Sequence, residues 1–157
     1  HYSVELLSGY RKQHAPKGMN RSDYITYGIE NHYLRLTSVY DRCLRLTNTV
    51  FKLGLPEKEC KESTIIKNKH IKNTDIAIHL KQLNKFTSDF RHHRNNVAHN
   101  STYSEEKLDR LNMFYFVTEL DSEFDNFRGM IKQSTDEFVV EKKAEFDLCI
   151  KEIEKIL

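Results

Sequence analysis

The longest amphipathic pattern in the sequence is SDYITYGIENHYLRLTSVYDRCLRLTNTVFKL, residues 22–53. Apolar side chains recur in it at steps of three, four or seven residues, which places them along one face of an α-helix. They are Ile25, Ile29, Leu36, Tyr40, Cys43 and Val50, with Tyr33, Leu44 and Phe51 widening the stripe. Asn20 or Ser22 can cap the start of this helix, and Gly54 followed by Pro56 ends it. The pattern predicts one long helix that buries a single face.

The second helical pattern begins near Thr74 and Asp75, where a side-chain oxygen can cap and a carboxylate complements the helix dipole. Its expected buried stripe is Ile76, Leu80, Leu83 and Phe90. Arg94 follows Ile76 by eighteen residues, or five full turns, so an unbroken helix would place its guanidinium on the apolar stripe. That position is costly unless the cation is paired or faces a cleft. The other interpretation is that the helix has left the core by then and Arg94 reaches water.

Two more helices are expected before the end of the chain. The third should start at Thr102 or Ser104, because Thr102 and Glu105 have the spacing of a capping box. Its stripe is expected to be Met113, Val117, Leu120, Phe124, Phe127 and Ile131. Ser134 and Glu137 predict a second capping box, at a turn into the last helix. That helix should bury Val139, Phe146, Ile150, Ile153 and Leu157.

These patterns together predict an all-α fold, an up-and-down bundle of four to five helices. We expect residues 1–21 to form an N-terminal segment that is weakly structured or a short helix, since Pro16 and Gly18 interrupt it. Residues 22–157 are expected to form one helical domain. Within it, residues 55–73 form a connection rich in Lys and Glu that can contain a short helix.

Composition limits the class of protein. Five Gly and two Pro in 157 residues argue against a sheet protein with many turns. No apolar run approaches membrane-spanning length and no secretory signal is visible, so we expect no membrane partner. The chain begins at His1 rather than Met, which indicates a trimmed end or an added residue. The cysteines have no close pairing, which favours a reducing cytoplasm; they are Cys43, Cys60 and Cys149.

The stretch RHHRNNVAHN, residues 91–100, lies between the second and third helices and contains Arg94, Asn95 and His99 in the pattern Arg-Asn-x-x-x-His. This pattern resembles the signature of the HEPN superfamily (higher eukaryotes and prokaryotes nucleotide-binding). The resemblance implies a HEPN-like helical bundle, and many such domains are metal-independent endoribonucleases. It also implies a homodimer, because HEPN nucleases line one cleft with the motifs of two domains.

The residue types suit RNA cleavage without a metal ion. A histidine exists in both protonation states near neutral pH, so His99 can act as base or acid, and Arg94 can grip phosphate oxygens. Asn95 would orient the histidine or the phosphate. Arg94 and His99 are five residues apart, or about 140° around a straight helix, so they do not face one point. Either the helix loosens near Asn96 or a phosphate bridges the two side chains.

Neighbouring residues extend the candidate site. Arg91, His93 and Tyr103 are candidate substrate-binding residues. The alternative is that Arg91, His92 and His93 are solvent-facing charges at a helix end, where the helix dipole favours cations. A zinc site of His92, His93 and His99 is disfavoured, because adjacent residues point in different directions on a helix and no Cys or carboxylate is near in sequence. We expect neither a metal nor a cofactor. HEPN toxins partnered by minimal nucleotidyltransferases often carry a Tyr two residues after the histidine. In this chain that position is Ser101, and the nearest Tyr is Tyr103.

The charge distribution is uneven. Residues 1–103 carry a net charge of +8 and residues 104–157 a net charge of −6. A basic portion that contains the motif would attract a polyanion such as RNA, unless the charges interleave in three dimensions.

Two other functional classes compete with a nuclease that acts in toxin–antitoxin systems or antiviral defence. One is a non-catalytic HEPN module that binds a nucleotide or a protein, and the other is a structural helical adaptor. Expected partners of the nuclease are RNA, a second copy of the chain and, on family analogy, an antitoxin protein.

Overall fold

The computed structural model describes residues 2–99, 102–120 and 127–157, and within these ranges the chain is helical with no strand. The helices are α1 (Tyr2–Leu6), α2 (Arg21–Val50), α3 (Glu62–Lys67), α4 (Asp75–Ser88), α5 (Arg91–His99), α6 (Glu106–Leu120) and α7 (Arg128–Ile156), with short 3₁₀ turns at Lys12–His14 and Glu57–Glu59. The predicted all-α fold is confirmed, and the four long predicted helices correspond to α2, α4, α6 and α7. None of the described helices combines the length and apolar character that crossing a membrane requires.

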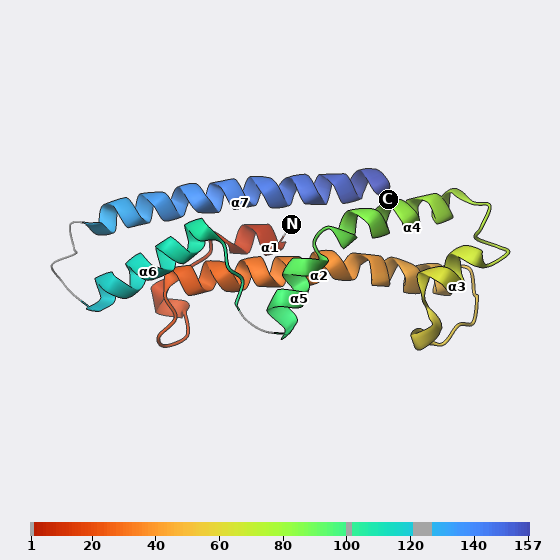
Figure 1. Cartoon of the computed structure of the whole chain (residues 1–157), viewed down its shortest axis with the longest axis horizontal. Coiled ribbons are helices and arrows are strands. Elements are labelled where there is room, and N and C mark those ends of the chain that lie inside the picture. Colours follow the sequence, from red (N-terminus) through yellow and green to blue (C-terminus); the bar gives the residue numbers. More distant parts are fainter. Residues whose placement is uncertain (1, 100–101, 121–126) are drawn as a thin grey trace.

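The two longest helices, α2 and α7, run in the same direction along the long axis of the molecule and are offset, with α7 reaching farther towards the α6 end and α2 farther towards the α3 end (Figure 1). The shorter α4 and α6 run in the opposite direction near the two ends of the molecule, and α1 packs on α2 and α7 (Figure 1). α5 packs on the middle of α2 and projects away from α7 (Figure 1). Because α5 covers no other long helix, most of its surface faces outward.

α2 forms as the sequence predicts. Asn20 accepts a hydrogen bond from the Asp23 backbone N–H at 2.9 Å, and the Asp23 carboxylate accepts one from the Asn20 backbone N–H at 3.0 Å, which completes a capping box. Ile25 and Ile29 are fully buried, whereas Val50 at the other end of the stripe is exposed. Gly28 lets α1 approach, since a Cβ there would lie 2.8 Å from the Leu7 side chain.

The predicted start of the third helix is wrong, and so are both expected capping boxes. α6 begins at Glu106, and the Glu105 carboxylate pairs with Lys142 instead of capping a helix. Among the described side chains of α6 the buried ones are Leu108 and Leu111 rather than Met113, which is 59% exposed. Of the other predicted stripe positions, Val117 is half-buried, Phe127 is exposed and Ile131 is buried. The side chain of Leu120 and all of Phe124 lie outside the described residues.

The last helix also starts earlier than predicted. α7 begins at Arg128 and continues through Ser134, so the turn expected at Ser134 does not exist. Thr135 is buried within α7, and its hydroxyl donates to the Ile131 carbonyl at 2.6 Å. A buried threonine in a helix can donate its hydroxyl hydrogen bond to a backbone carbonyl one turn earlier, so a Ser-Thr pair does not have to end a helix.

Two groups of buried side chains form the core. One is centred on Tyr33 of α2 and Phe146 of α7, with contributions from α1 and α6. The other lies at the far end, where Ile65 and Ile71 from the Lys- and Glu-rich connection pack against α2 and α4. That connection therefore contributes to the core, although it is rich in Lys and Glu.

Candidate motif helix and its support

The motif lies on a helix of its own. α4 ends at Ser88, a turn at Asp89 and Phe90 changes the direction of the chain, and α5 begins at Arg91. Arg94 therefore does not continue the apolar stripe of α4, because the helix is broken before it. None of the nine side chains of α5 is fully buried.

The inner face of α5 is fixed by an aromatic contact. The His93 ring stacks on the Tyr33 ring of α2, with centroids 4.4 Å apart and planes 15° apart. Val97 is half-buried and packs against the same core group. His93 and Val97 are four residues apart and so share one face of the helix. This face sets the position of α5 on the bundle.

The outer face of α5 carries the motif. Arg94, Asn95 and His99 are all exposed, and none of their side chains has a hydrogen-bond or ion-pair partner among the described residues. α5 is continuous from Arg91 to His99, so the helix does not loosen at Asn96. Arg94 and His99 therefore lie about 140° apart around the axis, while Asn95 and His99 share a face.

A polar cluster lies beneath α5. The Lys142 side chain on α7 is 9% exposed, and its ammonium contacts the Glu105 carboxylate at 2.7 Å and the Glu145 carboxylate at 2.8 Å. Glu145 also accepts a hydrogen bond from the Tyr33 hydroxyl at 3.1 Å. The Tyr103 hydroxyl donates to Glu105 at 2.7 Å. The Tyr33 ring on which His93 rests is thus held by its hydrogen bond to Glu145 of α7, and Glu145 is in turn paired with Lys142.

The pKa values in this cluster follow from burial and pairing. Burial alone would lower the pKa of Lys142, but hydrogen bonds to Glu105 and Glu145 outweigh it and raise the pKa above its ordinary value. Burial alone would raise the pKa of Glu105, and the hydrogen bonds from Lys142 and Tyr103 reverse this. Lys142 and Glu105 are therefore charged at neutral pH.

The two histidines near Tyr33 are uncharged at neutral pH, unlike these ion-paired residues. Burial, together with His92 and Lys142 nearby, lowers the pKa of His93. Burial also lowers the pKa of His32, which stacks on Phe146 with centroids 3.6 Å apart, to about 4. Both rings are neutral at pH 7.

The three candidate substrate-binding residues occupy different surroundings. Arg91 is exposed, and its guanidinium donates to the Asn84 side chain. His93 is half-buried against Tyr33, and Tyr103 is buried, with its backbone N–H bound to the Glu30 carboxylate at 2.7 Å. His92 and His93 adjoin, but within the described ranges no three His, Cys, Asp or Glu side chains form a cluster that could hold a metal ion.

Sequence reasoning missed the supporting cluster. Lys142 lies three and four residues from Val139 and Phe146, so it occupies the buried stripe of α7. A lysine at such a position signals a buried ion pair, because an unpaired ammonium is rarely buried. No pattern in the sequence indicated that Glu105, before α6, would be its partner.

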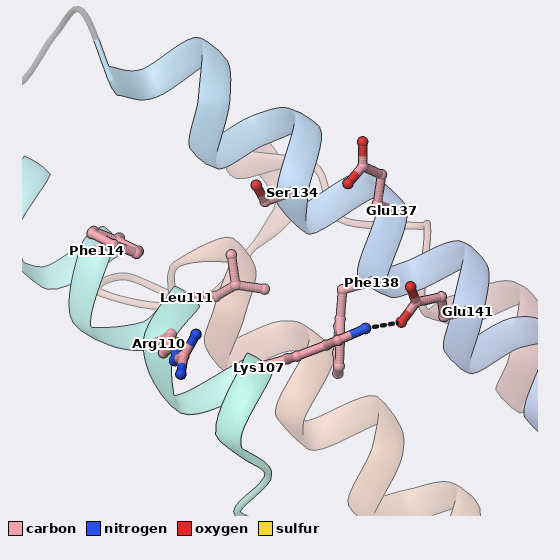
Figure 2. Close-up of a pocket in the computed structure, with 8 residues that line it drawn as sticks. All are labelled: Lys107, Arg110, Leu111, Phe114, Ser134, Glu137, Phe138 and Glu141. Atoms are coloured by element: carbon pink, nitrogen blue, oxygen red, sulfur yellow. Dashed lines mark hydrogen bonds and ion pairs between the residues drawn. The ribbon is translucent and has the colours of Figure 1, made fainter.

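A concave pocket between α6 and α7 does not contain the motif. Figure 2 shows its lining, where the Lys107 ammonium pairs with the Glu141 carboxylate at 2.6 Å. Arg110, also in this pocket, pairs with Glu106. Because its cations are already paired, this pocket has little unpaired charge for an anionic ligand.

The sequence similarity of the chain to a known protein family agrees with the observed fold. An all-α bundle carrying Arg-Asn-x-x-x-His on a surface helix fits the class of helical modules called HEPN domains, which are of nucleotide-binding or RNase type. The family model for the Cthe2314-like HEPN family (HEPN_Cthe2314) matches residues 2–157, and the chain belongs to this family. No curated protein and no solved structure matches the chain significantly.

Proposed function

We propose that the protein is an endoribonuclease of HEPN type that cleaves RNA without a metal ion, in a composite site formed by two copies of the chain. The observation that carries this proposal is the outer face of α5, where Arg94, Asn95 and His99 are exposed without partners among the described residues. A charged and polar face without internal partners is suited to an external ligand, and family membership favours RNA or a nucleotide.

The proposed reaction begins at the RNA 2′-hydroxyl. His99 takes its proton, and the 2′-oxygen attacks the adjacent phosphorus. The bond from phosphorus to the 5′-oxygen breaks, and His99 of the partner subunit donates a proton to that leaving oxygen. Arg94 stabilises the extra negative charge on the phosphate oxygens, and Asn95 orients His99 or the phosphate. The products are a 2′,3′-cyclic phosphate and a 5′-hydroxyl.

Two copies of the chain are needed on chemical and geometric grounds. One histidine cannot be base and acid in the same step. Arg94 and His99 of one α5 also point about 140° apart, so one helix does not surround a phosphate. A second α5 related by two-fold symmetry would supply the missing side.

The remaining candidate residues have different proposed roles. Arg91 would contact a phosphate next to the cleaved one, since its guanidinium is exposed. The burial of Tyr103 and the stacking of His93 on Tyr33 favour a role in holding α5 over direct contact with RNA.

Incubation of the purified protein with a structured RNA in EDTA tests the proposal. We expect fragments that end in cyclic phosphate from the wild type and none from Arg94→Ala/His99→Ala. The matched control is His70→Ala/Lys72→Ala, which removes the same residue classes from exposed positions outside α5. Cleavage by the double motif variant, or a monomer by sedimentation at a concentration where the enzyme is active, would contradict the proposal.

A non-catalytic HEPN module is the second candidate, favoured by the unbroken helix that separates Arg94 from His99. In that case RNA or a nucleotide binds and remains intact. If the protein is a nuclease, expression of the wild type in cells should slow growth and His99→Ala should not, as expected of a cytoplasmic toxin or defence effector restrained by an antitoxin protein.

A further inference from the structure

The N-terminal loop between α1 and α2 has an unusual composition. Residues 7–20 contain Arg11, Lys12 and Lys17 and no carboxylate, and Arg21 follows as the first residue of α2. Arg21 pairs with Asp136 of α7, but Arg11, Lys12 and Lys17 have no ion-pair partner among the described residues. Three unpaired cations on one short loop create a positive surface.

The loop has a fixed shape rather than an extended one. The Tyr10 hydroxyl donates to the Met19 carbonyl at 3.0 Å and so joins the two ends of the loop. The Tyr10 ring contacts the Tyr24 ring of α2, with centroids 5.7 Å apart. Gly9 lies close to the same ring, since a Cβ there would be 3.1 Å from the Tyr24 hydroxyl. These contacts hold the cations over the first turns of α2.

Two adjoining hollows open on this loop. One, of about 400 Å³, is lined by Tyr10, Arg11, His14, Tyr24 and Tyr27, among others. The other, of about 470 Å³, shares Tyr10 and adds Lys12, Lys17 and Arg21. No carboxylate lines either hollow, in contrast to the paired charges of the pocket between α6 and α7. We name the two hollows together the loop surface.

Tyr27 gives the loop surface an exposed aromatic ring. It is 61% exposed, although a tyrosine on α2 would gain free energy by packing against a neighbour. An exposed ring beside unpaired cations is the arrangement that binds single-stranded nucleic acid, because bases stack on the ring and phosphates approach the cations. A duplex keeps its bases stacked on each other and offers no free base to such a ring.

The loop surface lies on the same side of the bundle as α5. In Figure 1 the loop and α5 both project from the side of α2 that faces away from α7. Tyr27 precedes Tyr33, on which His93 of α5 rests, by six residues, which is about 9 Å along the helix axis and about 120° around it. A small domain can bind four or more nucleotides of a single strand, so one strand can reach both places.

We propose that the loop surface binds single-stranded RNA, with Tyr27 stacking on a base and Arg11, Lys12 and Lys17 contacting phosphates. The inference rests on the proposed function and specifies its substrate as an unpaired strand that extends from α5 along α2. Tyr27 would bind the RNA without taking part in its cleavage.

The test measures binding of a fluorescent single-stranded twelve-nucleotide polyuridine RNA to full-length His99→Ala, which does not consume the probe. Tyr27→Ala should weaken binding by roughly tenfold, and Tyr27→Phe, which keeps the ring, should restore it. Arg11→Gln/Lys12→Gln/Lys17→Gln should lower the slope of log affinity against log salt by about 2, or about 0.7 for each lost phosphate contact. Thermal unfolding of each variant checks that the fold is retained.

The matched control is Lys58→Gln/Lys61→Gln/Lys67→Gln, which removes three exposed, unpaired lysines near α3 and so the same net charge. For this control, the slope of log affinity against log salt should fall by less than about 0.7, the value of one phosphate contact. An equal fall in both triple variants, unchanged binding by Tyr27→Ala, or equal affinity for a duplex of the same length would overturn the inference.

The outcomes separate this inference from the proposed nuclease. If the wild type cuts RNA and the loop variants bind and cut RNA as well as the wild type, the proposed RNA binding by the loop surface is wrong and the proposed nuclease activity is retained. If binding depends on the loop and the wild type cuts no RNA, RNA binding by the loop surface is retained and the proposed nuclease activity is wrong. Absence of any RNA binding by His99→Ala and by the wild type overturns both.

Discussion

α4 and α5 are neighbours in the sequence and both pack on α2, but they do so in opposite ways. α4 buries Leu80 and Leu83 along a continuous stripe, whereas α5 buries no side chain fully. α4 thus contributes apolar burial to the core. α5 depends on one ring contact and one half-buried valine, and leaves its polar face outside. This difference fits the proposed function, in which the polar face of α5 meets a ligand while α4 contributes stability.

The largest expected effect separates activity from stability on α5. His99→Ala should reduce the rate of RNA cleavage at least 100-fold, the range for loss of a general acid or base. The free energy of unfolding should change by less than about 0.5 kcal/mol, because the side chain is exposed. Cleavage assays and urea unfolding on the same sample measure both. A comparable loss of stability would mean that His99 supports the fold.

The converse effect is expected on α4. Leu83 is fully buried, so Leu83→Ala should lower the free energy of unfolding by about 3 kcal/mol. Val97→Ala on α5 should cost about 1 kcal/mol or less, because Val97 is only half-buried. Urea unfolding of the two variants gives the difference directly. Equal losses would show that α5 is as much a part of the core as α4.

Of the two core groups, the one beneath α5 contains His32, and acid should lower the free energy of unfolding through this residue. Below pH 6.5 the unfolded chain protonates His32, while the folded chain protonates it only near its pKa of about 4. The free energy of unfolding therefore falls as the pH drops from 6.5 towards 4, by about 2–3 kcal/mol at pH 4.5. His32→Phe should remove this part of the pH dependence. If urea unfolding of wild type and His32→Phe shows the same pH dependence, His32 is not the cause.

The smallest expected effect concerns the ring contact itself. His93→Ala removes the stack on Tyr33 and should weaken the docking of α5 by about 1 kcal/mol, whereas His93→Phe should keep it. Hydrogen exchange should become faster in α5 and remain unchanged in α4. Faster exchange in both helices would indicate that the two are one cooperative unit.

The long apolar stripes made most of the fold predictable. The stripe of α2 and its Asn20 cap were sufficient to locate that helix, because both signals are local. The errors arose where several local signals compete. Ser134 has the spacing of a capping box, but burial of Thr135 on α7 prevails over it.

The candidate site was only partly predictable. The motif could be found by pattern, but the turn at Asp89 and Phe90 that places it on a separate helix could not, because neither residue is a strong helix breaker. The ion pair between Lys142 and Glu105 joins residues that are far apart in sequence. Such a partnership depends on how α6 packs against α7, and no short window of sequence contains that information.

Gly28 connects the interior of the molecule to its proposed RNA surface. The Leu7 side chain occupies the space that a methyl group at position 28 would need, and the loop with Arg11 and Lys12 follows directly after α1. Gly28→Ala would therefore force the buried Leu7 side chain to move, although position 28 lies on no proposed ligand surface. Under the proposed function, a substitution at this glycine would reach the loop surface from inside the protein, with every motif residue intact.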